Sequence, residues 1–369
     1  MTRDEFGETL PGTPAADGFR MPAEFDPHEQ CLMLWPERAD NWRERAAPAQ
    51  AAFAAVAAAI GRFEPVTVGV SPGHLPRAQG QLAASGVSTL ALPHDDSWMR
   101  DVGPTFVTRA GEAARGVHWR FNAWGGLYRP CDLDEAVAAR VLERQGRRRY
   151  RPPLILEGGA IHVDGQGTAL VTEECLLNPN RNPGMTRERM ESALREYLGV
   201  SHVIWLGRGV YEDETGGHID NLACFVAPGK VVLNLPDEKS DPQYPISLDA
   251  WERLRAARDA AGRPLEVTPL PMPGPFHMTA EEAGGLAPGG DIKARRAGDR
   301  LAASYVNFYF ANGAIVMPLL DPRTDAIAAE RLRRLCPDRQ VVGVPAREIL
   351  LGGGGIHCIT QQVPSEARP

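Results

Sequence analysis

Three segments of this chain repeat one short pattern, in which an apolar strand, a tight turn that contains glycine and a second apolar strand follow one another. The turns read DG, PG and NG, which are typical of β-hairpins. A helical pattern and a further strand follow each hairpin, and this alternation favours an α/β fold. Repetition of one supersecondary unit indicates a ring or a solenoid. The three segments are Ala160–Val171, Ala223–Leu235 and Val306–Leu319.

Two further units extend the repeat to five. A weaker hairpin is expected at Thr105–Phe121, with its turn at Arg109–Glu112. The fifth unit joins the two ends of the chain, because a C-terminal strand at Gly355–Gln361 can pair with Cys31–Trp35. Five units, one of which contains both ends, favour a closed ring over an open solenoid.

The same alternation of helices and strands fills most of the chain, and no long linker divides it. We therefore expect a polar extension at 1–20 and a single domain at 21–369. The stretch Pro271–Asp299, rich in glycine and proline, is predicted to be a loop. The other strands are predicted at Val66–Val70, Val117–Phe121, His202–Leu206, Leu265–Thr268 and Gln340–Val344, and helices at Ala47–Phe63, Asp134–Gln145, Thr186–Leu198, Leu248–Ala261 and Thr324–Cys336.

Charge and hydropathy exclude several classes of protein. The 369 residues include 40 basic and 47 acidic ones, a net charge of -7, and no basic block is present, so nucleic acid is not an expected partner. No apolar run approaches the roughly 20 residues that cross a bilayer. The first residues lack a secretory pattern, which predicts a cytoplasmic protein away from membranes. The six cysteines are widely spaced and form no CxxC pair, which argues against a structural zinc site.

The polar residues stand at the same place in every unit, just before its first strand or within it. The local sequences are WMRD, LEGG, GHID, SYVN and GIHC. If the units are related by rotation, these positions face one axis and their side chains converge. The candidate catalytic residues at these positions are Asp101, Glu157, His218, Asp220 and Cys358.

One thiol, one imidazole and three carboxylates can bind and attack a guanidinium group. Two carboxylates satisfy its fork of N–H donors, and a thiolate can attack its carbon. On a strand, His218 and Asp220 would share a face, whereas His357 and Cys358 would not. We therefore interpret His357 as a supporting residue. The four glycines that end at Gly355 indicate an unusual backbone path or the close approach of a ligand.

The motifs resemble those of the agmatine deiminases, which belong to the guanidine-modifying superfamily together with bacterial-type peptidylarginine deiminases. The similarity runs from about Met21 to Pro364. It implies a five-bladed, pseudo-symmetric α/β propeller of ββαβ units with the active site on its axis. The matching stretches are MPAEFDPHEQ, LMLWPERADNW, DSWMRDVGPTFV, FNAWGG, LEGGAIHVDGQGTALVTEECLL, NRNPG, ETGGHIDNLACFVAPG and GGGGIHCITQQ.

The resemblance also implies roles for the candidate catalytic residues. Cys358 would be the nucleophile that forms a covalent amidino-thioether, and His218 would be the general acid and base. Asp101 and Asp220 would clamp the guanidinium, and Glu157 would bind one of its nitrogens or orient His218. A purely structural role stays open as an alternative, since Asp101 could be paired with its neighbour and Glu157 could cap a turn.

Four further residues would bind the rest of the substrate. Trp98 and Trp124 would wall its aliphatic part, Gly355 would let it approach the backbone, and Glu214 would pair with a distal amine. The two tryptophans could equally be core residues, and Glu214 belongs to an acidic run that could be solvated. The segment after FNAWGG is shorter than in many members of the family, which leaves the distal pocket open.

These residues predict hydrolysis of agmatine to N-carbamoylputrescine and ammonia, a reaction that serves polyamine synthesis, without a metal or an organic cofactor. The expected partner is a cationic guanidino small molecule, and the family implies a homodimer. Three alternatives stay open. They are a deiminase of peptidyl arginine or another guanidino compound, a guanidine-binding protein without catalysis, and a structural metal protein that uses His and Cys.

Overall fold

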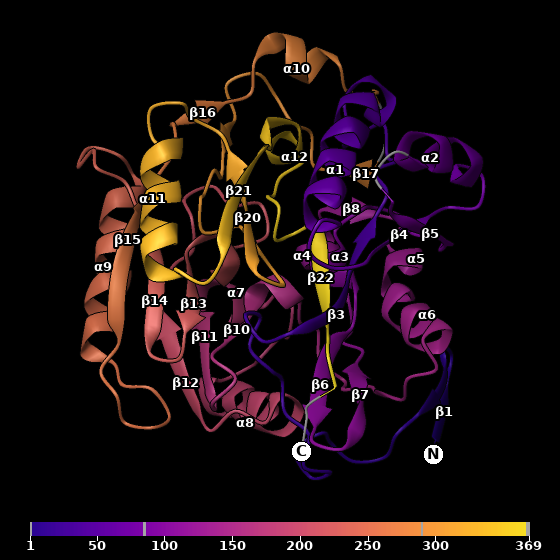
Figure 1. Cartoon of the computed structure of the whole chain (residues 1–369), viewed down its shortest axis with the longest axis vertical. Coiled ribbons are helices and arrows are strands. Elements are labelled where there is room, and N and C mark those ends of the chain that lie inside the picture. Colours follow the sequence, from indigo (N-terminus) through magenta and orange to yellow (C-terminus); the bar gives the residue numbers. More distant parts are fainter. Residues whose placement is uncertain (1, 84–85, 289–290, 367–369) are drawn as a thin grey trace.

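The computed structural model describes residues 2–83, 86–288 and 291–366 (Figure 1). Within these ranges, five sheets of three or four strands share one plan, in which two antiparallel strands are followed by a strand parallel to the second of them, and in four of the sheets the antiparallel pair is a hairpin. The fold is therefore of the mixed α/β class, as predicted. The sheets are β6(Thr105–Arg109), β7(Glu112–Val117) and β9(Arg149–Tyr150); β10(His162–Val163), β11(Thr168–Thr172) and β12(His202–Leu206); β13(Ala223–Ala227), β14(Lys230–Leu235) and β15(Glu266–Pro271); β19(Tyr309–Ala311), β20(Ala314–Leu319) and β21(Gln340–Pro345); and β22(Thr360–Pro364), β3(His28–Leu34), β4(Val66–Val70) and β5(Ser88–Ala91).

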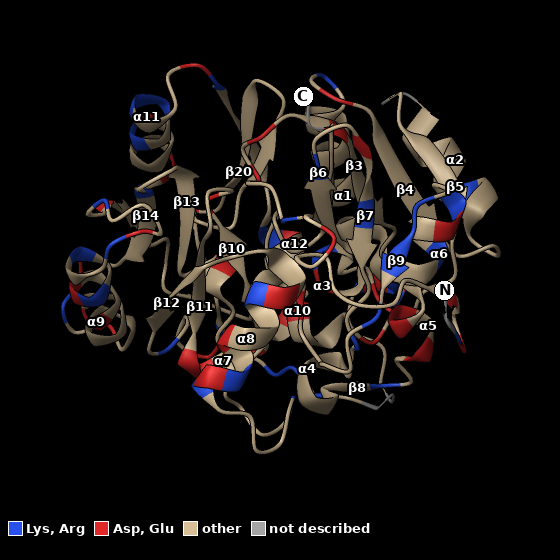
Figure 2. Ribbon diagram, turned by 90° about the horizontal axis from the view of Figure 1, so that it is seen from below, with Lys and Arg blue, Asp and Glu red and all other residues tan. Residues whose placement is uncertain are grey.

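Helices connect the antiparallel strand pairs to the parallel strands that follow, and most of them carry charged residues. Figure 2 shows Lys and Arg on α9 and α11, whereas strands β11, β12 and β13 carry no charged residue. The apolar strands pack in the interior as expected. The helices are α1(Ala47–Ile60), α2(Leu75–Leu82), α3(Met99–Val102), α4(Ala123–Gly126), α5(Asp132–Glu135), α6(Val137–Arg144), α7(Glu173–Leu176), α8(Arg187–Leu198), α9(Gln243–Ala256), α10(Ala280–Gly284), α11(Asp325–Leu335) and α12(Arg347–Leu351), with 3₁₀ turns η1(Glu44–Ala46), η3(Gly158–Ala160) and η4(Ile219–Asn221).

The two ends of the chain meet in one sheet, as predicted. Strand β22 pairs antiparallel with β3, and Thr360 lies opposite Met33. The predicted hairpins also form, and Gly229 and Gly313 adopt left-handed φ angles of 75° at two of their turns. Only glycine takes such angles without a steric cost, which explains the PG and NG signals.

Several predicted boundaries are wrong. The C-terminal strand begins at Thr360 rather than Gly355, so Gly355 and Cys358 lie in the turn before it. Strand β7 ends at Val117, and the residues after it leave the sheet apart from one bridge at Arg120. Helix α9 starts at Gln243, five residues before the predicted start. Its first turn tolerates a proline because the N–H groups there have no partner within the helix.

The predicted loop Pro271–Asp299 contains short elements where residues are described. Strands β16(Phe276–His277) and β17(Asp291–Ile292) pair with β18(Arg300–Leu301) and β8(Tyr128–Arg129), respectively. Helix α10 begins with a capping box at Thr279 and Glu282, which satisfies two backbone N–H groups reciprocally. Residues 289–290 of the loop lie outside the described ranges.

The N-terminal residues pack against the rest of the fold. Strands β1(Thr2–Asp4) and β2(Gly7–Thr9) form a hairpin, the Asp4 carboxylate pairs with Arg149, and Phe19 is buried. In the described part of the chain, no helix has both the length and the apolar character needed to cross a membrane.

Candidate active site

The five candidate catalytic residues lie on short turns rather than on strands. Each turn directly precedes the first strand of one sheet. This is the predicted place for four of the residues, the prediction is wrong for Cys358, which was placed within its strand, and the predicted convergence is confirmed. Turns η3 and η4 contact each other, as do α3 and η3. Asp101 lies on α3, Glu157 precedes η3, His218 precedes η4, Asp220 lies on η4, and Cys358 lies in the turn before β22.

Three of these side chains meet over Gly159, the last residue of LEGG. A β-carbon at this position would lie 2.5 Å from His218 Nδ1, 2.9 Å from Asp220 Oδ2 and 3.0 Å from Asp101 Oδ1. Any larger residue would fill the space that they face. All of the candidate catalytic residues are buried, with exposures of 6% or less.

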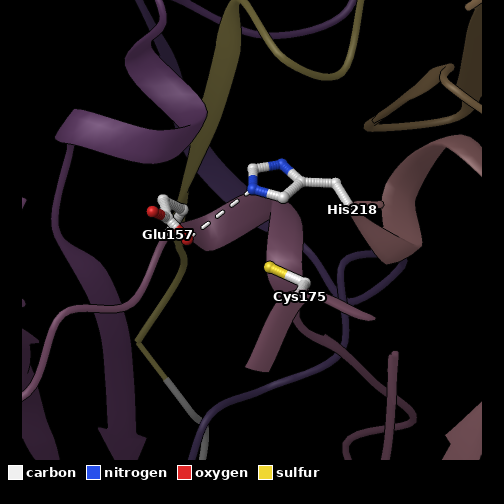
Figure 3. Close-up of side chains that lie close together, drawn as sticks. All are labelled: Glu157, Cys175 and His218. Carbon is white, nitrogen blue, oxygen red and sulfur yellow. Dashed lines mark ion pairs between the residues drawn. The ribbon is translucent and has the colours of Figure 1, made fainter. Parts of the chain in front are cut away.

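His218 lies among acceptors without a hydrogen bond to any of them. Its Nε2 is 3.7 Å from Glu157 Oε2 and its Nδ1 is 3.9 Å from Asp101 Oδ2 (Figure 3). Burial alone would lower the pKa of the imidazole, but Asp101, Cys175 and Glu157 outweigh it and raise the pKa well above its usual value. The ring is therefore held as an imidazolium whose N–H groups remain free for chemistry.

Glu157 is ionised by a cation behind the site. Arg181 Nε donates a hydrogen bond of 2.9 Å to Oε1, while Oε2 is buried without a partner. Burial raises the pKa of Glu157, but Arg181 and His218 overcome this and lower it to about 2. The glutamate therefore presents one unsatisfied anionic oxygen to the site.

Asp101 balances between its two charge states. The N–H of Gly159 and the indole Nε1–H of Trp124 each donate to it over 2.9 Å. Burial raises its pKa to about 6, since His218 only partly offsets burial and the neighbouring Asp220 and Glu157 charges. Trp124 itself adopts a left-handed φ of 53° on α4, a costly conformation that aims its indole at the carboxylate.

Asp220 is supported by a buried chain of charges. His357 Nδ1 lies 2.9 Å from Asp220 Oδ2, and its Nε2 lies 2.8 Å from Glu24 Oε2. Burial and Arg100 oppose the charge on His357, but Glu24 and Asp220 raise its pKa. Burial also opposes the charge on Asp220, but His357 lowers its pKa. Asp220 Oδ1 is left buried and unpartnered.

The Cys358 thiol closes the site opposite these carboxylates. It donates a hydrogen bond of 3.4 Å to Asp220 Oδ2. Burial, Asp220 and Asp101 raise its pKa well above the usual value, whereas Gly355 N–H and Asn307 act in the opposite direction. Cys358 therefore favours the thiol form, and a nearby cation is needed to favour the thiolate.

The four predicted substrate-binding residues border this centre. Trp98 packs against the glycine turn, where a β-carbon at Gly354 would lie 2.6 Å from its ring, and its ring is 6.3 Å from that of Trp124. Gly355 lies against Cys358. Glu214 is 22% exposed and pairs with Arg295 over 2.7 Å. Its role toward a distal amine stays a prediction, and any such amine meets Arg295 on the same carboxylate.

Glu157, Cys175 and His218 have ligand atoms that lie within 4.8 Å of one another (Figure 3). A thiolate, an imidazole and a carboxylate are ligands that Zn²⁺ accepts, with a fourth position left open. This set shares His218 and Glu157 with the candidate active site, so a metal held there would occupy the groups that face Gly159.

Known proteins resemble this chain over nearly its whole length. A profile of Porphyromonas-type peptidyl-arginine deiminases matches residues 20–364. This chain belongs to that family. The resemblance inferred from the motifs is confirmed. A protein of Latilactobacillus sakei subsp. sakei, called "putative agmatine deiminase", is 54% identical over 97% of this chain and 99% of its own length. The solved agmatine deiminase of Enterococcus faecalis has a TM-score of 0.94 at 41% identity, covering 98% of this chain and 100% of that one.

Sequence reasoning missed the residues that support the site of this family member. Arg181 lies in the stretch NRNPG and Glu24 in MPAEFDPHEQ, so both were in recognised motifs without an assigned role. Asn307 is the last residue of SYVN, the place that Asp101, Asp220 and Cys358 hold in WMRD, GHID and GIHC, and that repeat position could have identified it. Their contacts join residues far apart in the chain, which a local pattern does not reveal.

Proposed function

We propose that this chain hydrolyses agmatine to N-carbamoylputrescine and ammonia. The observation that carries the proposal is that two buried carboxylate oxygens, Glu157 Oε2 and Asp220 Oδ1, accept no hydrogen bond, while the other oxygen of Asp220 accepts one from the Cys358 thiol. Burying such oxygens without partners is costly unless a cationic donor joins them. A planar guanidinium supplies both the charge and the N–H donors.

In this proposal the carboxylates hold the guanidinium and the charge of the substrate favours the thiolate. Asp101 and Asp220 clamp the group, and Glu157 binds one of its nitrogens. The positive charge of the substrate compensates for the Asp220 and Asp101 charges that keep Cys358 protonated. The thiol proton passes to solvent as the cation binds, and the sulfur attacks the central carbon from a fixed distance and direction.

His218 moves the protons in both halves of the reaction. The Cys358 sulfur forms a bond to the guanidinium carbon, His218 donates a proton to the departing nitrogen, and the C–N bond breaks to release ammonia. A covalent amidino-thioether remains. Water then attacks the same carbon while His218 accepts its proton, and the C–S bond breaks to release the ureido product and the Cys358 thiolate.

The substrate class follows from the relatives and from the charge around the site. Two relatives that cover 97% and 98% of the chain, at 54% and 41% identity, carry the agmatine deiminase name. Arginine carries a carboxylate beside its amine, whereas agmatine carries the amine alone. Glu214 provides an acidic partner at the border of the site. Trp98 and Trp124 would flank the methylene chain, and Gly355 would admit the reacting group to the thiol.

We further propose the finer features of the molecule that the family implies. The five sheets would form the blades of one α/β propeller, and residues 21–369 would form a single domain preceded by the extension at 1–20. The protein would be a cytoplasmic homodimer, as the family implies. The reaction as written uses no metal and no organic cofactor.

The test compares three substrates. The purified protein is incubated with agmatine, free arginine and an arginine-containing peptide, and ammonia and ureido product are measured, with Cys358→Ala as the control. Product chiefly from agmatine, and none from the variant, is the expected result. Product chiefly from the peptide would make the chain a peptidylarginine deiminase with the same chemistry. Saturable binding without product from any of the three would identify an inactive guanidine-binding protein.

A further inference from the structure

The five turns that build the site bring together five reactive side chains and the amide of Asn307. Asp101, Glu157, His218, Asp220 and Cys358 come from four of these turns, whereas the turn before β19 contributes Asn307. Asn307 is 1% exposed and its side-chain nitrogen Nδ2 lies 3.1 Å from Cys358 Sγ. This amide therefore lies within hydrogen-bond distance of the sulfur.

Its neighbours fix the direction of this amide. The backbone N–H of His357 donates a hydrogen bond of 2.9 Å to Oδ1, and the N–H of Cys358 lies 3.4 Å from the same oxygen. A backbone N–H can only donate, so the oxygen must face these two groups. Nδ2 then faces the other way, toward Asn221 Oδ1 at 2.9 Å and the Cys358 sulfur. The sulfur therefore meets a donor rather than an acceptor.

The glycine next to the cysteine turn makes room for this contact. A β-carbon at Gly355 would lie 2.3 Å from Asn307 Oδ1, closer than real atoms approach. The Gly355 N–H also acts on the sulfur in the direction that favours the thiolate. The end of the glycine run thus fits the amide against the backbone.

The groups that face the sulfur have opposite effects on the pKa of the Cys358 thiol. Asp220 and Asp101 are anionic and favour the protonated thiol, and His357 acts on the sulfur only through Asp220. Asn307 and Gly355 are neutral donors, which stabilise a thiolate without repelling a cationic substrate. A lysine or arginine in that place would favour the thiolate more strongly but would repel a guanidinium.

We propose that Asn307 is a catalytic residue that donates a hydrogen bond to the Cys358 thiolate. This rests on the proposed function in one respect, namely that Cys358 is the nucleophile. The bond stabilises the sulfur anion before it attacks the guanidinium carbon and again when the C–S bond breaks and the sulfur leaves. Asn307 takes no proton and forms no covalent bond.

The variants separate two roles of the Asn307 amide, the hydrogen bond that its nitrogen donates to the sulfur and the hydrogen bonds that its oxygen accepts from the backbone. Asn307→Asp keeps an oxygen for the His357 and Cys358 N–H groups and replaces the donor by an acceptor. Asn307→Ala removes both. The matched control is Asn312→Asp on the same hairpin, because Asn312 also accepts from a backbone N–H and donates to a backbone carbonyl, those of His28, but is remote from the sulfur.

The readout is the rate at which iodoacetamide alkylates Cys358 as a function of pH, followed by peptide mass spectrometry. This measurement needs no substrate, so it stays informative if agmatine is not turned over. We expect the midpoint of alkylation to rise by about one pH unit in Asn307→Asp, which is about tenfold less thiolate at a given pH. Asn307→Ala shifts it in the same direction, and Asn312→Asp leaves it unchanged.

Turnover provides the second readout. Loss of one donor to a reacting anion costs about 10²–10³-fold in kcat where the anion is oxygen, so a fall of about 10–100-fold is expected for the softer sulfur. In a Cys358→Ala background, the neutral variant Asn307→Ala should leave the affinity for agmatine unchanged, because the anion that the amide serves is gone.

Two results would overturn the proposal. One is an alkylation midpoint that stays at the wild-type value in both Asn307 variants while circular dichroism shows them folded. The other is an equal loss of agmatine affinity with and without Cys358, which would assign Asn307 a structural role. Absence of agmatine turnover in the unmodified enzyme would refute the proposed function instead, and the alkylation profile would still test Asn307.

Discussion

Two buried histidines lie on opposite sides of Asp220 and differ in what their ring nitrogens bind. Both have raised pKa values caused by nearby carboxylates that outweigh burial. His357 has each nitrogen within 2.9 Å of a carboxylate oxygen, from Asp220 and Glu24. His218 approaches Glu157 and Asp101 no closer than 3.7 Å and 3.9 Å and makes no hydrogen bond through its ring.

This difference separates a structural cation from a chemical one. A histidine with both N–H groups bound to carboxylates cannot give a proton to a substrate without losing that contact. A histidine with both N–H groups free in a buried, anionic site keeps its proton and can deliver it. We therefore expect loss of His218 to affect turnover and loss of His357 to affect stability.

The largest effect is expected from His218→Gln. Removal of a general acid and base costs about 10²–10⁴-fold in rate, so kcat for agmatine should fall by that factor. Ammonia release is the measurement, and circular dichroism reports the fold. A variant with more than a tenth of the wild-type kcat would show that another group moves the protons.

His357→Gln should mainly destabilise the protein. It leaves Glu24 and Asp220 buried with less cationic support, and breaking a buried ion pair costs about 3–5 kcal/mol in the free energy of unfolding. Because the folded pKa of His357 is raised, its contribution is full below the unfolded pKa and is lost as pH rises through the folded one. Urea unfolding should therefore show a difference from wild type that shrinks at alkaline pH, and an increasing difference would contradict the assignment.

Glu214→Gln should weaken substrate binding without changing the chemistry. A half-exposed ion pair contributes up to about 1 kcal/mol, so KM for agmatine should rise by roughly fivefold while kcat is kept. Butylguanidine, which lacks the amine, is the control substrate and should show no change. Equal changes for both substrates would exclude contact between Glu214 and the amine.

Trp124→Phe should produce the smallest effect, a shift in pH dependence. Asp101 has a pKa of about 6, so its charge is present above that pH and is lost as pH falls through it. The acid limb of kcat/KM should therefore lie near pH 6. Removing the indole donor disfavours the ionised carboxylate and should move the limb upward by about half a unit, since a hydrogen bond to a charged group contributes at least that much. A limb that moves downward would contradict this assignment.

The sequence was sufficient to predict the repeat and the residues at its turns, because both are local patterns. Hairpin turns with glycine, helical periodicity and polar residues at one position of every unit led to Asp101, Glu157, His218, Asp220 and Cys358. The short helical turns on which these residues lie were not predicted, and Cys358 was placed within a strand. Short apolar runs look like strands whether or not they begin with a helical turn, and Cys358 precedes β22 rather than lying in it.

The supporting residues could not be predicted because their partners are distant in the chain. Glu24 meets His357 across 333 positions, and Asn307 meets Cys358 across 51. Glu214 was predicted on its acidity alone, and no local pattern shows that Arg295 lies beside it. Such pairs depend on how sheets and turns are placed in space.

The most direct test of the account is to quench the enzyme with acid during turnover of agmatine and to locate the covalent adduct by peptide mass spectrometry. The account predicts the mass of agmatine less one ammonia on Cys358, present in the wild type and in His357→Gln and strongly reduced in His218→Gln. An adduct on Cys175, or ammonia release at the wild-type rate by Cys358→Ala, would contradict it.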